Sequence, residues 1–365
     1  MPLTEAFPSK RLVSLDAFRG ATIALMVLVN DPGDGRHSYS PLQHSQWNGW
    51  TITDVVFPSF LWIVGVAITL SLGARLAAGV PKAKLLLQAA RRAAIIYILG
   101  LIVYAWPLDL STQRLLGVLQ RIAICYLIVA AIYLYCNLRG QLLWLAGLLV
   151  VYWLLMTLVP VPGYGPGRLD VEGNLAHYVD HIVLGAHNYH STKTWDPEGI
   201  VSTLPAIATA LLGIMAGRLI RIQRQLAERV VWLFVVGSVL LALGMICNTW
   251  LPINKKLWTT SFALFMGGLD FVLLALFIWV VDHLGYQRYV RPFVIIGMNS
   301  IAVYMASELG DVLLGQTGWH GVIYRSVFAP LASPANASLL YAFTYVLLMY
   351  AIAYGMYRRK WFWRV

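Results

Sequence analysis

Long apolar segments recur along this chain of 365 residues, and they decide what it can fold into. Each runs for roughly 18 residues or more with few charges, which is the length that a helix needs to cross the core of a bilayer. Lipid offers no water to backbone N–H and C=O groups, and a helix satisfies them within its own segment. The sequence therefore predicts an all-α integral membrane protein, a polytopic bundle of about ten transmembrane helices. The expected spans cover residues 12–30, 54–74, 85–106, 114–136, 141–159, 199–221, 230–250, 257–281, 292–312 and 338–357.

The overall composition agrees with this class. Hydrophobic residues make up 59% of the chain and charged residues only 12%, which is too few charges for the surface of a soluble domain of this size. No stretch of the sequence repeats another. We therefore predict a single transmembrane domain over residues 1–365.

The basic residues predict the orientation of the chain in the membrane. The formal net charge of +11 would suggest nucleic acid for a soluble protein, but Lys and Arg also gather in the cytoplasmic loops of membrane proteins. An even number of spans puts both termini on one side, and all but eight of the 27 basic residues fall on that side. We expect cytoplasmic termini and no nucleic acid partner, with the stretch around His44 and residues 159–199 and 251–257 exoplasmic. The eight exceptions are Arg36, Arg114, Arg121, Arg168, Lys193, Lys255, Lys256 and Arg325.

Polar and aromatic residues gather in residues 42–60, at the start of the second apolar run. This stretch reads LQHSQWNGWTITDVVFPSF and contains His44, Trp47, Asn48 and Asp54. Histidine titrates near neutral pH and suits a general base, although an interfacial histidine can also simply bond to a loop. Asp54 opens the span, where a carboxylate either caps the positive helix end or takes part in chemistry, and the sequence leaves both open.

A polar turn ends the first span. The sequence NDPGDG begins at Asn30, and its proline and glycines force a turn. Asn30 then lies at the outer end of the span, where its amide can face back into the bundle. Asp31 follows it in the turn and is a further candidate for binding a substrate.

Arg114, Gln120 and Arg121 give the strongest polar signal inside an apolar span. Burying an arginine in a span costs free energy unless the side chain is paired or in contact with water, so such a residue is a functional candidate by default. Arg114 and Arg121 are seven residues apart and are expected to share one helical face. The structural alternative is an ion pair with Asp270 or Glu308 from another span.

The longest non-apolar stretch, residues 159–199, carries histidines and ends in two carboxylates. His177 and His181 have a spacing that zinc ligands use, but no HExxH signature accompanies them, and we expect a surface pair and no metal. Asp196 and Glu198 stand in WDPEG, just before the sixth span. They are expected to cap that helix, or alternatively to serve acid–base chemistry.

Three further polar residues stand at the ends of spans. Asn254 and Lys255 lie in the outer turn LPINKKLW, where lysine runs against the charge bias and suggests a role with an anion or a sugar. Asn299 enters the ninth span in GMNSIAVY, where it either bonds a neighbouring helix or contacts a substrate.

These segments together resemble the heparan-α-glucosaminide N-acetyltransferase family. The resemblance rests on RLVSLDAFRG, LMVLVNDPGDG, LQHSQWNGWTITDVVFPSFLWIVG, RLLGVLQRIAICY, WDPEGIVSTLPAIATALLGIMAGR, LPINKKLW, IIGMNSIAVY and YRRKWFW, which cover nearly the whole chain in order. Members of the family move an acetyl group from cytosolic acetyl-CoA to a glucosamine amine across the membrane. The essential histidine of the family's H-x-x-W-N-G motif matches His44, and the asparagine of its V-N motif matches Asn30.

The resemblance implies an acetyl-CoA-dependent acyltransferase, a compact bacterial-type member that needs no metal. It implies a multi-pass protein of the bacterial inner membrane with the active histidine toward the periplasm. The expected partners are acetyl-CoA, an exoplasmic amino sugar and membrane lipid, and formation of a homodimer is open. Beside the catalytic pair His44 and Asn30, the residues expected to bind substrate or acetyl-CoA are Asp31, Trp47, Asn48, Asp54, Arg114, Gln120, Arg121, Asp196, Glu198, Asn254, Lys255 and Asn299.

Two questions stay open at the level of the sequence. His44 can act as the general base for the amine, or it can carry the acetyl group itself. The polar residues in spans also fit a transporter or flippase for an amino sugar, and the chemistry also fits an O-acetyltransferase of a periplasmic glycan. Solute flux without consumption of acetyl-CoA would mark a transporter, and a hydroxyl acceptor would mark the O-acetyltransferase.

Overall fold

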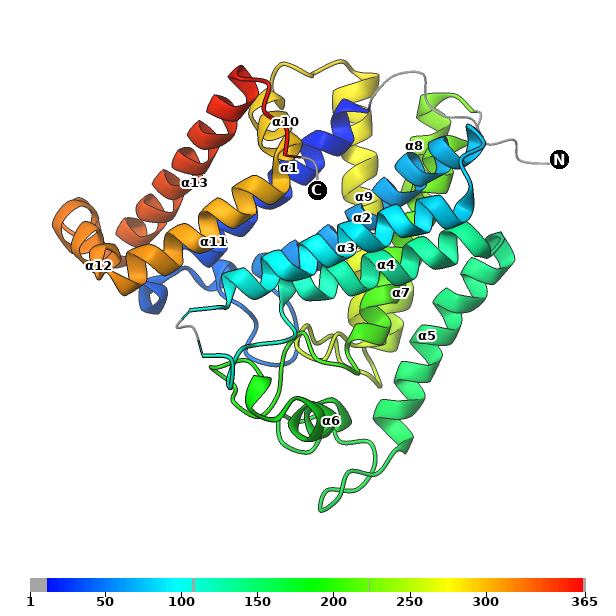
Figure 1. Cartoon of the computed structure of the whole chain (residues 1–365), viewed down its shortest axis with the longest axis horizontal. Helices are drawn as coiled ribbons and strands as arrows, with labels where there is room; N and C mark the ends of the chain where they lie inside the picture. The colour runs from blue at the N-terminus through cyan, green and yellow to red at the C-terminus, as the bar shows by residue number, and fades with distance from the viewer. Residues whose placement is uncertain (1–11, 107–108, 223, 364–365) are drawn as a thin grey trace. The chain divides into compact units, whose positions relative to one another are not determined.

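The computed structural model describes residues 12–106, 109–222 and 224–363, and its regular structure there is helical apart from isolated β-bridges (Figure 1). Nine helices in this part of the chain are long and apolar enough to span a membrane. The prediction of an all-α polytopic membrane protein is therefore confirmed. The nine are α1 (Val13–Asn30), α2 (Ile52–Ala77), α3 (Lys82–Val103), α4 (Val118–Tyr135), α5 (Leu138–Leu158), α7 (Thr203–Arg221), α8 (Leu226–Cys247), α9 (Thr260–Phe277) with the π-helix η4 (Ile278–His283) that continues it, and α13 (Pro334–Arg358).

The remaining expected span is broken. Helices α10 (Arg291–Met298) and α11 (Ser300–Gln316) together have the length and composition of a span, but they meet at 82°. Asn299 stands between them with φ −124° and ψ 38°, outside the α-helical region. The prediction of one continuous helix over residues 292–312 is therefore wrong. The pair is either a bent span or a re-entrant segment.

Short helices occupy the connections between these long ones. Most of them are single turns, and α6 is the longest at 10 residues. They are η1 (Gly35–His37), η2 (Ser40–Leu42), α6 (Leu175–Leu184), η3 (Gly185–His187), α12 (Trp319–Ile323) and the π-helix η5 (Tyr324–Phe328).

Contacts group the described residues into two compact units. Unit 1 contains residues 46–49 and 57–275, and unit 2 contains residues 12–45, 50–56 and 276–363. This grouping does not decide the expectation of a single domain, which stays a prediction.

In unit 1, α2 and α7 cross with their backbones in direct contact. A Cβ atom on Gly65 of α2 would lie 1.9 Å from the carbonyl oxygen of Ala210, and one on Gly213 of α7 would lie 1.9 Å from that of Trp62. Glycine at such a crossing lets two backbones approach, which gains van der Waals contact where lipid supplies no hydrophobic driving force. These two helices are the most buried of the nine candidate spans, so the crossing fixes the centre of unit 1.

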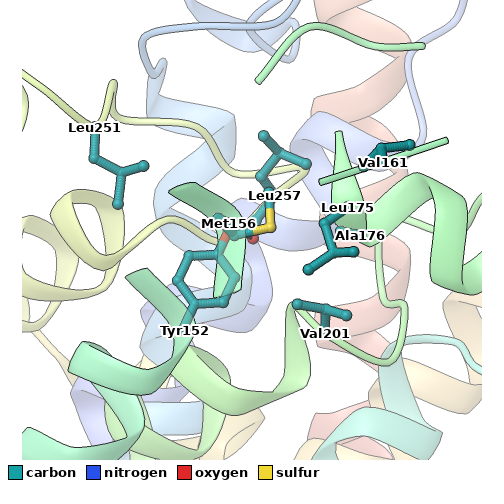
Figure 2. Close-up of a cluster of buried hydrophobic side chains, with 8 residues drawn as sticks. All are labelled: Tyr152, Met156, Val161, Leu175, Ala176, Val201, Leu251 and Leu257. Carbon is teal, nitrogen blue, oxygen red and sulfur yellow. Dashed lines mark hydrogen bonds between the residues drawn. The ribbon is translucent and has the colours of Figure 1, made fainter. Parts of the chain in front are cut away.

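A cluster of buried apolar side chains joins the loops of unit 1 to α5 (Figure 2). The hydroxyl of Tyr152, inside the cluster, donates a 2.7 Å hydrogen bond to the carbonyl of Leu257, so its polar atom is satisfied. The cluster thereby holds residues 159–202 and 251–257 against one end of the helix. Its buried members are Tyr152, Met156, Val161, Leu175, Ala176, Val201, Leu251 and Leu257, and Trp47 packs against them.

In unit 2, α1 and α10 make the same kind of contact. A Cβ atom on Gly20 of α1 would lie 1.7 Å from the carbonyl oxygen of Phe293, and one on Gly297 of α10 would lie 2.1 Å from that of Asp16. Helix α13 also packs against α1 and α10. The carboxyl end of α1, where Asn30 lies, therefore belongs to a helix with closely packed neighbours.

Candidate active site

His44 and Asp54 of unit 2 form a hydrogen-bonded pair. The Nδ1 atom of His44 lies 2.7 Å from Oδ1 of Asp54. The side chain of Asp54 is 1% exposed, whereas that of His44 is 51% exposed. A buried carboxylate thus holds one edge of the imidazole, and much of the ring stays accessible.

The second oxygen of Asp54 explains why the loop before α2 folds in this way. Oδ2 accepts hydrogen bonds from the backbone N–H groups of Ser45 and Thr51, both at 3.0 Å, and from the Thr51 hydroxyl at 3.2 Å. N–H groups at the start of a helix lack partners within the helix, and side-chain oxygens commonly supply them. One oxygen of Asp54 therefore organises the start of α2, and the other orients His44.

This geometry sets the protonation pattern of the imidazole. We assign the ring hydrogen to Nδ1, because that atom faces a carboxylate, and Nε2 then keeps a lone pair. Such a lone pair can accept a proton from an amine or attack a carbonyl carbon. The base and the acetyl-carrier mechanisms are both open to this ring.

Asn30 is the last residue of α1 and is exposed, whereas its neighbour Asp31 is buried. Burial, together with the carboxylates of Asp311 and Glu308, raises the pKa of Asp31 to about 9. Asp31 therefore keeps its proton at neutral pH. In that form it can donate a hydrogen bond beside the Asn30 amide, a property that the sequence did not indicate.

The other residues of the motif, Trp47 and Asn48, are anchored to loops of unit 1. The indole Nε1 of Trp47 donates a 2.8 Å hydrogen bond to the carbonyl of Leu169, and its ring meets that of Trp195 edge-on at 5.7 Å. The side-chain nitrogen of Asn254 donates to Oδ1 of Asn48 at 3.2 Å. The predicted site residues Trp47, Asn48 and Asn254 are thus brought together.

A buried ionic cluster forms the second polar centre of unit 1. Arg114 binds Asp196 with two hydrogen bonds, Nε to Oδ2 at 2.8 Å and Nη2 to Oδ1 at 2.6 Å, and Nη2 also bonds Glu198 at 2.5 Å. Its guanidinium lies 4.7 Å and 4.4 Å from the ring centroids of Tyr104 and Tyr189. Planar guanidinium groups favour this combination of bidentate carboxylate binding and aromatic stacking.

The charges of this cluster support one another. Burial acts to raise the pKa of Glu198, but Arg114, Arg121 and Lys255 together hold it below its usual range. Burial likewise acts to lower the pKa of Arg114, but its carboxylate partners raise it overall. Arg114 and Glu198 therefore favour their charged forms, whereas burial raises the pKa of Asp196. Lys255 contributes to the field at Glu198.

Two sequence-based expectations about this region are wrong. Arg114 precedes α4, which begins at Val118, so the shared helical face with Arg121 does not exist. Asp196 and Glu198 do not cap α7, because α7 begins at Thr203, well after both residues, and both bind Arg114. Asp270, one of the two partners named in the structural alternative, does not bind either arginine in the described chain. Its Oδ1 accepts a 2.5 Å hydrogen bond from Ser59, which lies on α2.

Arg121 is fully buried in α4 and holds the segment that leads into α7. Its Nη2 atom donates to the carbonyl of Gly199 at 3.0 Å and to the hydroxyl of Ser202 at 2.5 Å, and its guanidinium lies 5.2 Å from the Trp258 ring centroid. Gln120, beside it, is equally buried. Gln120 packs so closely against α3 that a Cβ atom on Gly100 would come within 2.4 Å of its Oε1 atom.

Asn299, the last predicted site residue, lies at the break between α10 and α11. Its Oδ1 atom accepts a 3.1 Å hydrogen bond from the backbone N–H of Trp363. Asn299 is fully buried, so its observed contact is with the C-terminal segment of the same unit.

Sequence reasoning missed Asp180, which supports the Arg114 cluster from α6. Its carboxylate accepts hydrogen bonds from the backbone N–H of Ile200 at 2.9 Å and of Asp196 at 3.3 Å. A signal was present in the sequence. Asp180 is four residues after Ala176 and four before Leu184, so it lies on the apolar face of an amphipathic helix. A carboxylate on such a face requires partners in the interior.

The fold and the His44–Asp54 pair define a multi-pass helical membrane protein with a histidine oriented by a carboxylate at the start of a span. The family model "Heparan-alpha-glucosaminide N-acetyltransferase, catalytic" matches residues 11–247. The chain belongs to this family, as its motifs predicted.

Two curated proteins illustrate the similarity. Heparan-alpha-glucosaminide N-acetyltransferase from Homo sapiens is 31% identical over 410 residues, which covers 97% of this chain and 60% of that protein. The protein of the same name from Mus musculus is 30% identical over 419 residues, with coverage of 100% and 62%. The chain thus spans about 60% of the length of these relatives.

Proposed function

We propose that this chain is a transmembrane N-acetyltransferase, which takes an acetyl group from acetyl-CoA and passes it to the amine of a glucosamine-type sugar. Family membership supports the class of reaction, since the human and mouse relatives are named for it. The observation that carries the proposal is the His44–Asp54 pair, with 2.7 Å between Nδ1 and Oδ1. A transfer to an amine needs a base that is both oriented and accessible, and this ring is both.

In the direct form of the reaction, Nε2 of His44 takes a proton from the amine as its nitrogen attacks the thioester carbonyl. The carbon–sulfur bond breaks, and the sulfur receives that proton to give the free thiol of CoA. Asp54 stabilises the imidazolium while it carries the proton, as a carboxylate does for an oriented histidine. Asn30 donates a hydrogen bond to the oxygen that becomes negative during the attack, an interaction worth about 3–4 kcal/mol in other enzymes.

In the two-step form, Nε2 attacks the thioester carbonyl itself and releases CoA before the amine arrives. The acetyl group then passes from the imidazole to the amine. Both forms use the same three side chains, and they differ in kinetics. Ping-pong behaviour marks the two-step form.

We assign the acceptor and donor contacts to the remaining polar residues of the predicted site. Trp47, Asn48, Asn254 and Lys255 combine aromatic, amide and cationic groups in one unit, which suits a sugar. The ammonium of Lys256, next to Lys255, lies 5.7 Å from the centroid of the Trp47 ring. Arg114 and Arg121 hold the segment before α7, so we assign them positioning roles. We propose cytoplasmic termini on the bias of the basic residues, and a bacterial inner membrane because the chain resembles the compact members of the family.

The experiment that tests the function uses purified, reconstituted protein with labelled acetyl-CoA. Glucosamine, a glucosamine disaccharide and sugars that offer only hydroxyl groups are presented in parallel. Label should appear in amide linkage on the amino sugars and should depend on His44. Label on hydroxyl groups alone would indicate an O-acetyltransferase. Uptake of amino sugar into vesicles without consumption of acetyl-CoA would replace the proposal with a transporter.

A further inference from the structure

In unit 2, helices α11 and α13 pack against each other and against α1 (Figure 1). The turn after α1 is bonded to α13, because the backbone N–H groups of Gly33 and Asp34 donate to the carbonyl and hydroxyl oxygens of Ser338 at 3.3 Å and 2.9 Å. A Cβ atom on Gly33 would lie 2.8 Å from the Cβ atom of Tyr341. Asp31, which begins this turn, is therefore held close to Tyr341 of α13.

Asp31 and Tyr341 are both buried, with exposed fractions of 6% and 5%. Within the described chain, neither the carboxyl of Asp31 nor the hydroxyl of Tyr341 forms a hydrogen bond. The neighbouring Tyr345, by contrast, donates a 2.9 Å hydrogen bond to the carbonyl of Ser307. Buried polar groups in native proteins are nearly always paired. These two groups therefore call for a partner that the described chain does not itself supply.

Helix α11 adds carboxylates to this group. Asp311 and Glu308 both act electrostatically on the carboxyl of Asp31. The carboxyl groups of Asp31 and Asp311 likewise act on the hydroxyl of Tyr341. Asp311 is exposed, whereas Asp31 and Tyr341 are buried. The acidic groups thus extend from the surface into the interior of unit 2, and the hydroxyl of Tyr341 faces them.

Two further rings flank Tyr341 and form the sides of this group. The ring of Tyr345 lies nearly parallel to it, with 6.4 Å between the centroids and 8° between the planes. The imidazole of His320 meets it at 67° with centroids 5.0 Å apart, and Nε2 of that ring lies 3.3 Å from the carbonyl oxygen of Pro32. The polar groups are therefore carried by packed side chains, which lose little entropy when a ligand binds.

We propose that Asp31, Asp311 and Tyr341 bind the protonated amine of the acceptor sugar. An ammonium group carries three N–H donors, and carboxylate and hydroxyl oxygens accept them. The faces of aromatic rings add attraction for such a cation. The site places the amine beside Asn30, which directly precedes Asp31. The identity of the ligand as the acceptor rests on the proposed acetyl transfer, whereas the binding of an ammonium group does not.

Binding of a cation here is linked to the proton of Asp31. Burial and the nearby carboxylates raise the pKa of Asp31 to about 9, so the carboxyl is protonated at neutral pH, and a bound cation favours its ionised form. Binding then releases one proton, and the affinity rises about tenfold for each pH unit up to about 9. The titratable groups that face Asp31 are Asp311 and Glu308 on α11 and Tyr341 and Tyr345 on α13.

The test titrates the whole chain in nanodiscs by calorimetry. The first probe is methylammonium, which like a lysine side chain keeps its charge between about pH 6.5 and pH 8.5. Its affinity should rise with pH in the unmodified protein and stay flat in Asp31→Asn. Tyr341→Phe should weaken it about tenfold, as expected for loss of one charge-assisted hydrogen bond. The second probe is glucosamine, which should bind at least about tenfold more tightly than N-acetylglucosamine, because the latter has no ammonium group.

The matched control is Asp34→Asn, which removes a carboxylate from the same turn and should leave both affinities within about twofold. Tyr341→Phe removes a hydroxyl that has no partner in the described chain, so this variant folds even if Asp31→Asn does not. An affinity for methylammonium that does not change with pH overturns the proposal, as does an equal loss in Asp34→Asn and Asp31→Asn.

The same variants separate this site from the proposed reaction. Binding of methylammonium that depends on Asp31 and Tyr341, without acetyl transfer to glucosamine, would retain the ammonium site and refute the acetyltransferase. Acetyl transfer with an unchanged KM for glucosamine in Tyr341→Phe would retain the reaction and overturn the site.

Discussion

Asp54 holds His44 by a 2.7 Å hydrogen bond, while its other oxygen accepts the backbone N–H groups of the residues that lead into α2. The position of the imidazole is therefore tied to the start of a membrane span. His44 lies in a loop, but its bond to Asp54 fixes it to the end of a helix. The proposed role of a base requires such a fixed position.

Asp54→Asn should separate the shape of this carboxylate from its charge. The amide has one acceptor where the carboxylate has two, so either the bond to His44 or the N–H bonds at the helix start are lost. We expect the rate of acetyl transfer to fall about 10²-fold or more. We also expect about 0.5–2 kcal/mol of destabilisation from the weakened cap. Turnover assays and thermal unfolding in detergent measure the two effects.

The control for this variant is Asp34→Asn, because Asp34 and His37 form a second pair of the same type in unit 2 at 2.8 Å. Both of its side chains are more exposed than that of Asp54. Turnover should stay within about twofold. Equal losses in both aspartate variants would show that Asp54 has no special relation to the chemistry.

His44→Ala should lower turnover by about 10²–10⁴-fold, the usual contribution of a general base. The side chain is half exposed, so folding and acetyl-CoA binding should be retained. Asn30→Ala in that background should add little, because groups that act as one unit are not additive. His37→Ala is the matched histidine control. A folded His44→Ala protein with near-normal transfer would remove His44 from the mechanism.

Arg114→Met should be among the most destabilising substitutions in unit 1. It leaves Asp196 and Glu198 buried without their cation, and breaking such a pair typically costs about 3–5 kcal/mol. Arg168→Met is the control, since Arg168 forms an exposed ion pair with Asp170 at 2.7 Å. That pair should contribute less than about 1 kcal/mol. Similar midpoints of chemical unfolding for the two variants would contradict this account of the cluster.

Asp180 should make stability fall as the pH rises through the acidic range. Burial raises its pKa from the ordinary value of 3.8 to about 6. Between these values the unfolded chain has released the proton while the folded chain still binds it, so the free energy of unfolding decreases as pH increases. The decrease is on the order of 2–3 kcal/mol and is complete above the folded pKa. Asp180→Asn should flatten this part of the curve of unfolding midpoint against pH, and an unchanged slope would argue against it.

Gly65→Ala should destabilise the contact between α2 and α7, because the added carbon would meet the carbonyl of Ala210 at 1.9 Å. Overpacking of this kind costs about 1–3 kcal/mol. Gly147→Ala in α5 is the control, since nothing lies within 4 Å of its added carbon. That change should be neutral or slightly stabilising, because alanine favours helix. Thermal unfolding should therefore show a lower midpoint for Gly65→Ala and an unchanged or slightly higher midpoint for Gly147→Ala.

The spans were predictable because each is a local property of the sequence. Hydropathy and length place α1, for instance, within one residue of its observed start, and they place α13 within a few residues at both ends. The start of α4 was not predictable in this way. Arg114 belongs to an extended approach that ends at Gly117, and a hydropathy window cannot separate such an approach from the helix that follows.

The polar contacts were harder to predict because their partners are distant in sequence. His44 and Asp54 are ten residues apart, so one motif contains both of them. Arg114 and Asp196 are 82 residues apart, and nothing local links them. Local patterns could suggest only a helix cap for Asp196, which is wrong because α7 begins at Thr203. They offered Asp270 or Glu308 as the structural alternative for Arg114, whereas the observed partner is Asp196.

The bend at Asn299 is in contact with the last described residues of the chain. The side-chain oxygen of Asn299 accepts a hydrogen bond from the backbone N–H of Trp363, 64 residues later in the chain. The last described residues therefore contact the point where α10 and α11 meet at 82°. Trp363 is thus part of the packing of unit 2, and without it the buried Oδ1 atom of Asn299 would lose this hydrogen bond.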